Sequence, residues 1–253
     1  MDLGVKETFM HLWKTHFNNA DLPIVFYFSD RQDSSELVHA SQGHRCLMSD
    51  LMEVQRGKSL RFGDKSFGCF GGKRYLGFSN QIMPNFEYFL SCGIPGQMEG
   101  ERYKKSPELV KEIMTKAPVM QPRAEFIVFK RWDKLDEMDE PEVVIFFAHS
   151  DVLSGLCTLA NFDRSDDGVI VPFGSGCSTI VQYPFLEKDV AFPKAILGMF
   201  DVSARPYVPE HTLSFAVPMT RFLVMIDNIG ESFLSTHSWG EVRKRITAHH
   251  GEA

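Results

Sequence analysis

Three of the five cysteines lie in or beside glycine-rich turns, and each turn leads toward an expected helix. Glycine allows the positive-φ backbone that exposes N–H groups and lets another group approach closely. The partial positive charge at a helix N-terminus stabilises a thiolate, and thiolates are nucleophiles and ligands for zinc or iron–sulfur clusters. The pattern therefore predicts that these cysteines bind a metal ion or an iron–sulfur cluster. They are Cys46 in the segment GHRC, Cys69 in GCFGG and Cys177 in GSGCS.

The spacing of these three thiols leaves two alternatives open. They stand 23 and 108 residues apart and form no CxxC pair, so only the fold can bring them together. In the first alternative, the cysteines are small turn residues with no joint role. In the second, one of them is an activated nucleophile for acyl transfer, assisted by His44 or His149. The sequence does not decide whether the chain is an enzyme.

The same glycine turns also suit a ligand other than a metal. A strand, a glycine turn and a helix in succession can hold an anion on backbone N–H groups. The turn at 174–179 lacks the lysine of a P-loop and the full GxGxxG fingerprint, so it does not indicate a nucleotide. The alternative function is therefore a non-catalytic module for a small anionic or aromatic ligand. Arg205 would then grip the anion, or else pair with a carboxylate. The residues expected to bind such a ligand are Gly71, Gly72, Gly174, Gly176, Ser178 and Arg205.

Composition narrows the class of protein and its partners. The chain has 253 residues, a formal net charge of −6 and a pI near 5.9, which argues against a nucleic-acid surface. No apolar run approaches the roughly 18–20 residues that cross a bilayer, so no membrane partner is expected. The odd cysteine count and the charged first residues favour the cytoplasm, where thiols stay reduced. A small molecule or a metal is the expected partner, and a homo-oligomer is compatible with the sequence.

The elements that must position these residues follow from apolar periodicity and from glycine and proline stops. The 22 phenylalanines mostly fall within these elements, which indicates an aromatic core; a larger aromatic pocket is the alternative. Helices are predicted at 3–17, 47–54, 85–92, 107–116, 150–161, 219–227 and 239–246. Strands are predicted at 24–28, 60–62, 126–129, 143–147, 169–171 and 213–217.

The order of these elements predicts the fold class. The strand at 143–147, the helix at 150–161 and the strand at 169–171 form a βαβ unit. No linker or low-complexity tract divides the chain. Pro23 and Pro141 each precede an apolar strand that leads to a Cys-bearing helix, but one such echo does not establish a repeat. We therefore predict one α/β (or α+β) domain over 1–253, with a mixed sheet flanked by helices.

Several motifs resemble those of a protein family called domain of unknown function 169. The resemblance covers about residues 20–245 and rests on the order of modest motifs rather than on any single one. Two positions depart from the family pattern, since Phe70 stands where members often carry Pro, and Glu142 replaces the usual Asp. The matching motifs are Cys46 with Gly57, the CFGG at 69–72, the LG at 76–77, the PEVV at 141–144, the GCS at 176–178 with Pro184, Gly198 with Asp201 and Arg205, and the VP at 217–218.

The resemblance implies a grouping rather than a reaction. The family's name carries no activity. Its motifs include all three turn cysteines, so the resemblance implies that Cys46, Cys69 and Cys177 act as one set.

Overall fold

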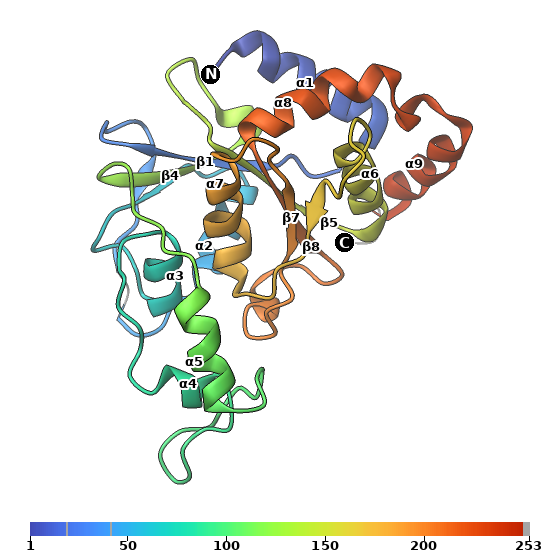
Figure 1. The fold of residues 1–253 in the computed structure, drawn as a ribbon. Coiled ribbons are helices and arrows are strands. Elements are labelled where there is room, and N and C mark those ends of the chain that lie inside the picture. The colour runs from blue at the N-terminus through green and yellow to red at the C-terminus, as the bar shows by residue number, and fades with distance from the viewer. Residues whose placement is uncertain (19, 41, 250–253) are drawn as a thin grey trace.

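An open, mixed sheet of eight strands forms the centre of the protein (Figure 1). The structure is a computed structural model, and it describes residues 1–18, 20–40 and 42–249. The strand order is β2-β3-β4-β1-β5-β8-β7-β6. The strands are β1 (Ile24–Ser29), β2 (Glu36–Leu37), β3 (Leu60–Phe62), β4 (Phe126–Arg131), β5 (Val143–Ala148), β6 (Val169–Ile170), β7 (Ala195–Gly198) and β8 (Leu213–Pro218).

Helices cover both faces of this sheet, which makes the chain a mixed α/β single domain, as the sequence predicts. The helices are α1 (Leu3–Phe17), α2 (Leu47–Gln55), α3 (Phe70–Tyr75), α4 (Phe86–Phe89), α5 (Pro107–Lys116), α6 (Ser150–Ala160), α7 (Tyr183–Glu187), α8 (Met219–Asn228) and α9 (His237–His249). A π-helical segment, η2 (Ser178–Gln182), runs directly into α7, and a short 3-10 helix, η3 (Arg205–Tyr207), follows β7.

Alternation along the central strands assigns each helix to one face. Val25 belongs to a core cluster with α1, α6, α8 and α9, whereas its neighbours Ile24 and Phe26 belong to a second cluster with α2, η2 and α7. Successive side chains of a strand point to opposite faces, so the two clusters lie on opposite sides of the sheet. Cys177 and Cys46 both belong to the second cluster. The face covered by α2 and α7 is therefore the one that carries the thiols.

The two halves of the sheet have the same topology. In the first half the order is β2-β3-β4-β1, where β1 is antiparallel to β4, β4 is antiparallel to β3, and β3 is parallel to β2. In the second half β6, β7, β8 and β5 repeat this order and these directions. The halves join through the antiparallel pair β1 and β5. The sheet therefore contains a structural repeat that the weak echo in the sequence does not reveal.

The repeat places one βαβ unit in each half. In the first half α2 connects the parallel neighbours β2 and β3, and in the second half the η2–α7 helix connects β6 and β7. The predicted unit of β5, α6 and β6 has its strands in the same sheet, but β8 and β7 lie between them. The sequence analysis did not predict β2, which has two residues, or β7, which has four.

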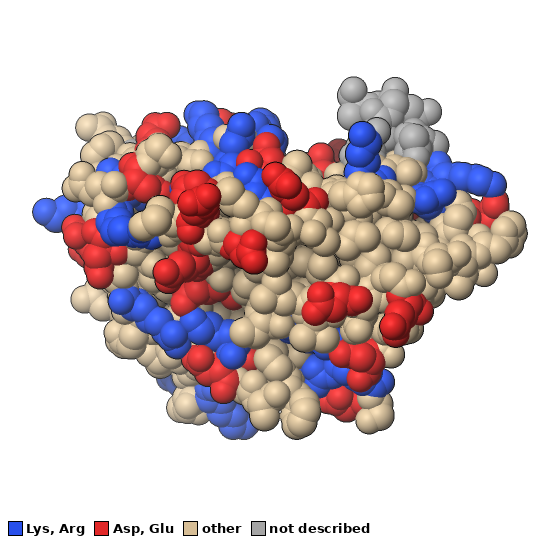
Figure 2. All heavy atoms as spheres, turned by 90° about the horizontal axis from the view of Figure 1, so that it is seen from above, with Lys and Arg blue, Asp and Glu red and all other residues tan. Residues whose placement is uncertain are grey.

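No helix among the described residues is long and apolar enough to cross a membrane. Figure 2 shows basic and acidic side chains interspersed on the face seen from above, without a large patch of one sign.

Candidate functional site

Each of the three turn cysteines stands at the start of a helix. Cys46 immediately precedes α2, and Cys69 immediately precedes α3. Cys177 immediately precedes η2, which continues into α7. The unpaired N–H groups of a helix start attract negative charge. All three cysteines therefore stand at helix starts, as the glycine turns predict, but burial opposes the formation of a thiolate at Cys46 and Cys177.

The turns that carry Cys46 and Cys69 are packed side by side. The Arg45 N–H donates to the Gly68 carbonyl at 3.3 Å. A Cβ atom placed on Gly72 would lie 3.4 Å from the Leu47 Cβ and 3.8 Å from the Cys69 Cβ. Both distances are ordinary van der Waals contacts, so Gly72 lies directly between the start of α2 and Cys69.

The turn that carries Cys177 lies beside the C-terminal end of α3, the helix that begins after Cys69. The Tyr75 hydroxyl lies near the Ser175 side chain, and burial raises the pKa of Tyr75. The Ser178 N–H donates to the Ser175 Oγ at 3.1 Å, which caps the helix start. Helix α3 also contacts η2. Cys177, which belongs to the second half of the sheet, therefore lies near the turns of Cys46 and Cys69, which belong to the first half.

Electrostatic coupling shows that the three thiols are neighbours. Cys177 is 7% exposed, and burial raises its pKa well above the usual value; negative charge on Cys69, Cys46 and Asp201 raises it further. Burial also raises the pKa of the half-buried Cys46 thiol, and negative charge on Cys69 and Asp201 adds to the effect. The turns that carry the three cysteines therefore lie near one another on one face of the sheet.

Asp201 is a member of this site that the sequence did not assign to it. Its Oδ2 accepts a hydrogen bond from the Gly176 N–H at 3.0 Å, one residue before Cys177. Its Oδ1 accepts bonds from the N–H and the hydroxyl of Ser203 at 3.1 and 2.7 Å. The only signal for Asp201 in the sequence was its place in the family-like G…D…R segment.

The residues predicted to bind an anion are only partly free to do so. The Gly176 N–H already donates a hydrogen bond to Asp201, and the Ser178 N–H already donates one to the Ser175 side chain. The Arg205 guanidinium donates to the Thr212 carbonyl. A Cβ on Gly71 would lie 3.8 Å from the Cys69 Sγ, so Gly71 borders the thiol site. A Cβ on Gly174 would lie 2.5 Å from the Ser178 Oγ, so Gly174 packs against the residue next to Cys177.

The two candidate histidines lie at different places. His44 is exposed in the loop before Cys46. His149 is exposed at the end of β5, where its carbonyl accepts from the Leu153 N–H at 2.9 Å at the start of α6. Helix α6 packs on the face opposite the thiols.

The thiols do not form a ready-made site for a single ion. Among the described residues, no group of three or more His, Cys, Asp or Glu side chains is arranged to hold a metal ion. A tetrahedral ion with Zn–S bonds of about 2.3 Å requires sulfurs roughly 4 Å apart. A centre held by these thiols would therefore have to be larger than one ion, or the side chains would have to reorient.

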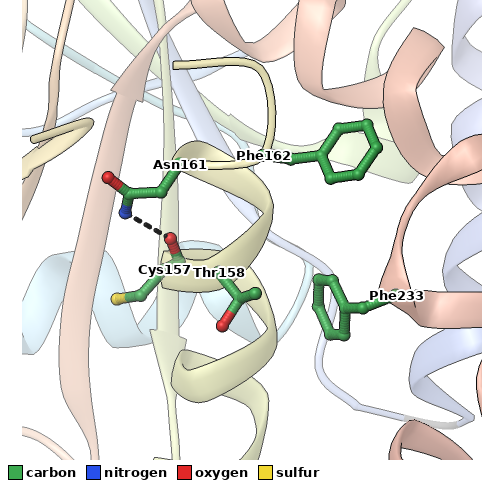
Figure 3. A pocket seen from close by; sticks show the side chains of 5 residues that line it. All are labelled: Cys157, Thr158, Asn161, Phe162 and Phe233. Atoms are coloured by element: carbon green, nitrogen blue, oxygen red, sulfur yellow. Dashed lines mark hydrogen bonds between the residues drawn. The ribbon is translucent and has the colours of Figure 1, made fainter. Parts of the chain in front are cut away.

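A surface cavity lies elsewhere, beside the end of α6 (Figure 3). It has a volume of about 450 Å³ and includes none of the three turn cysteines. Its polar side chains are satisfied within the helix, since Asn161 Nδ2 donates to the Cys157 carbonyl at 2.7 Å and Thr158 donates to the Ser154 carbonyl at 2.7 Å. Burial raises the pKa of the Cys157 thiol, which agrees with a packing role. Its lining residues are Cys157, Thr158, Asn161, Phe162 and Phe233.

Comparison with known proteins agrees with the resemblance seen in the sequence. The model of the DUF169 family, described as "Uncharacterised ArCR", matches residues 15–228. The chain belongs to this family. All three turn cysteines and Asp201 lie within the matched region of this DUF169 protein. No curated protein and no solved structure matches the chain.

Proposed function

We propose that this DUF169 protein binds an iron–sulfur cluster, or a metal centre of similar size, through Cys46, Cys69 and Cys177. The observation that supports the proposal is that three cysteines, each at a separate helix start, stand in neighbouring turns on one face of the sheet. Thiolates are the ligands that iron–sulfur clusters use in proteins. Such a cluster would supply electron transfer or Lewis-acid chemistry when bound.

The arrangement favours a cluster over a single ion. The described side chains offer no ready group for one ion. A cluster spreads its thiolates over a wider span, roughly 4–7 Å between sulfurs. Three helix starts around the centre offset part of the negative charge of three thiolates. The deep burial of Cys177 and the partial burial of Cys46 and Cys69 would limit the access of water and oxidants.

Anaerobic reconstitution of the reduced chain with ferrous iron and sulfide tests this proposal. The measurement is iron and sulfide per chain after gel filtration, together with the visible absorbance of the protein. We expect Cys46→Ser, Cys69→Ser and Cys177→Ser each to weaken retention of iron by about ten-fold or more. The matched controls are Cys92→Ser and Cys157→Ser, which should retain iron as the parent chain does. A parent chain that takes up no iron, or a Cys177→Ser variant that takes up as much, would refute the proposal.

A second candidate function is binding of an aromatic ligand, and exposed phenylalanines favour it. Phe70, Phe173 and Phe200 are 52%, 59% and 43% exposed, and each lies within a few residues of a member of the thiol site. The Lys104 Nζ lies 4.2 Å from the centre of the Phe173 ring, so the surface there offers both an aromatic face and a positive charge. An aromatic carboxylate matches both features.

Thermal-shift measurements with a series of aromatic carboxylates test the second candidate. A rise in Tm is expected for the parent chain, and Phe173→Ala should lose it. Phe192→Ala is the matched control, because Phe192 is 75% exposed but lies between α7 and β7 rather than in the turn that leads to Cys177. An unchanged Tm with every compound would count against this candidate and leave the iron experiment unaffected.

A further inference from the structure

We infer that residues 79–117, which contain α4 and α5, form a hinged cap that limits access to Cys177. We call these residues the α4–α5 unit. The inference goes beyond the proposed function, because it concerns access to the cysteine and is tested on the metal-free chain. Figure 1 shows α4 and α5 beyond α3, at the edge of the molecule and away from the sheet.

The two ends of the α4–α5 unit lie side by side on the body of the protein. Gly77 precedes the unit with a φ of 90°, and a Cβ atom placed on it would lie 3.0 Å from the Pro122 backbone nitrogen. Just after the unit, the Pro118 carbonyl accepts a hydrogen bond from the Gln182 Nε2, on η2, at 2.9 Å. The unit therefore leaves and re-enters the body at one place, which is the geometry of a hinge.

The α4–α5 unit is held together mainly by its own contacts. Helices α4 and α5 contact each other more extensively than they contact any other helix or strand. Backbone hydrogen bonds tie the loop between them to α4. The Glu101 N–H donates to the Phe89 carbonyl at 2.8 Å, and the Lys104 N–H donates to the Leu90 carbonyl at 3.0 Å. The unit can therefore move as one body, together with this loop.

The same loop contacts the two turns beside Cys177. The Lys104 Nζ lies 4.2 Å from the centre of the Phe173 ring, in the turn that leads to Cys177. The Tyr103 hydroxyl lies near Ser203. Ser203 belongs to the turn that is hydrogen-bonded to the glycine turn before η2. With these contacts in place, Cys177 is 7% exposed.

Both contacts are weak, so they can break while the body stays folded. A cation–π contact at the surface changes an equilibrium by only about two- to five-fold. The Tyr103 hydroxyl oxygen is buried, and within the described part of the chain it has no hydrogen-bond partner. Burial without a partner disfavours the closed arrangement, because water would bond the hydroxyl once the loop moved away. The α4–α5 unit is therefore poised to open.

Alkylation of the reduced, metal-free chain tests the inference. Labelling of Cys177 by iodoacetamide is followed in time by mass spectrometry of the tryptic peptide 165–188. Lys104→Ala should raise the labelling rate by about two- to five-fold, since it removes the contact with the Phe173 ring. Tyr103→Phe should lower the rate by about five-fold or more, since it removes only the unpartnered hydroxyl and keeps the ring.

Two controls separate opening of the α4–α5 unit from a general loosening of the fold. Lys105→Ala is the matched variant, because Lys105 is the exposed neighbour of Lys104 in the same loop. Cys157 is the internal reference, because it is half-buried against the core cluster on the opposite face of the sheet. Its labelling rate should be the same in the parent chain and in every variant.

The inference requires both signs at Cys177. If Lys104→Ala and Tyr103→Phe label Cys177 at the parent rate, the α4–α5 unit does not limit access, and the inference is refuted. A parallel change at Cys157, or a Cys177 thiol that reacts in no variant, would also refute it. Each of these results leaves the iron experiment unaffected, so the inference and the proposed function fail separately.

Discussion

The carboxylate of Asp201 accepts a hydrogen bond from the Gly176 N–H at 3.0 Å, at the start of the helix that carries Cys177. The start of a helix attracts an anion, and here the anion belongs to the chain itself. In the glycine turn at 174–178, the N–H group of Gly176 is therefore already hydrogen-bonded within the chain. The same bond ties the loop after β7 to the thiol helix, so Asp201 and Cys177 are positioned together.

Oxidation of the metal-free chain should report which thiols are neighbours. With oxidised glutathione, we expect one disulfide between Cys46 and Cys69, formed by two exchange steps that release two molecules of glutathione. The physical reason is the close packing of their two turns, seen in the bond between Arg45 and Gly68. Trypsin would leave these thiols in the peptides 46–56 and 66–73, and mass spectrometry would detect the linked pair.

The control for this experiment is Cys177→Ser, which should form the same linked pair. The other cysteines fall in separate tryptic peptides, 75–102, 135–164 and 165–188, so any other pairing would be visible. Glutathione adducts without a linked peptide would show that the two sulfurs do not meet.

A buried lysine should be a major determinant of stability. Lys130 on β4 is 1% exposed, and its Nζ lies 2.9 Å from Asp139 and 3.0 Å from Asp33. Lys130→Met would leave the buried Asp139 carboxylate without its counter-ion, with an expected loss of about 3–5 kcal/mol in the free energy of unfolding. Denaturant unfolding measures this loss. The double variant Lys130→Met with Asp139→Leu should recover part of it, and a loss below about 1 kcal/mol in the single variant would contradict the expectation.

Acid should weaken the fold through Asp163. Two hydrogen bonds from the Arg221 guanidinium, at 2.8 and 2.5 Å, lower the pKa of Asp163 from 3.8 to about 2. A lowered pKa means that the ionised form is favoured in the folded chain. The resulting stability is present in full above about pH 4 and is lost as the pH falls through 2.

Asp163→Asn should remove this contribution, about 1 kcal/mol after allowance for the partial exposure of the side chain. Unfolding in denaturant at pH 7 and at pH 2.5 measures it. The difference between parent and variant should shrink at the lower pH. A constant difference would show that Asp163 does not carry this part of the acid sensitivity.

A pair of glycine-to-alanine substitutions should have opposite effects. Gly155 lies in α6, where a Cβ atom would overlap the Trp239 ring and lie 2.8 Å from the Phe17 ring. Gly155→Ala should therefore lower the free energy of unfolding by about 1–3 kcal/mol. Gly240 lies in α9 with nothing within 4 Å of its Cβ position. Gly240→Ala should raise the free energy by up to about 1 kcal/mol, because alanine favours a helix more than glycine does. Thermal unfolding of both variants checks the two signs, and equal shifts would contradict the packing seen at Gly155.

Much of the fold is readable in the sequence because its signals are local. The apolar strand Val143–Ala148 and the amphipathic helix Ser150–Ala160 were predicted closely, since each has a clear period and clear stops. The family was also recognisable, from the order of short motifs over the region matched at 15–228. The predicted helix at 85–92 is shorter in the structure, at Phe86–Phe89, because Gly93 adopts a φ of 73° and the chain turns back through the Ile94 to Met98 bridge.

The sequence by itself determined which thiols stand at glycine turns, because a turn and a helix start are properties of neighbouring residues. Only the tertiary structure decided that the turns of Cys46, Cys69 and Cys177 lie near one another, since that depends on the order and direction of eight strands. It also placed the Asp201 carboxylate beside the Cys177 helix, through a hydrogen bond from the Gly176 N–H across a separation of 25 residues. Pairing between distant strands has no period in the sequence, and so the strand order had to be seen before the site could be assembled.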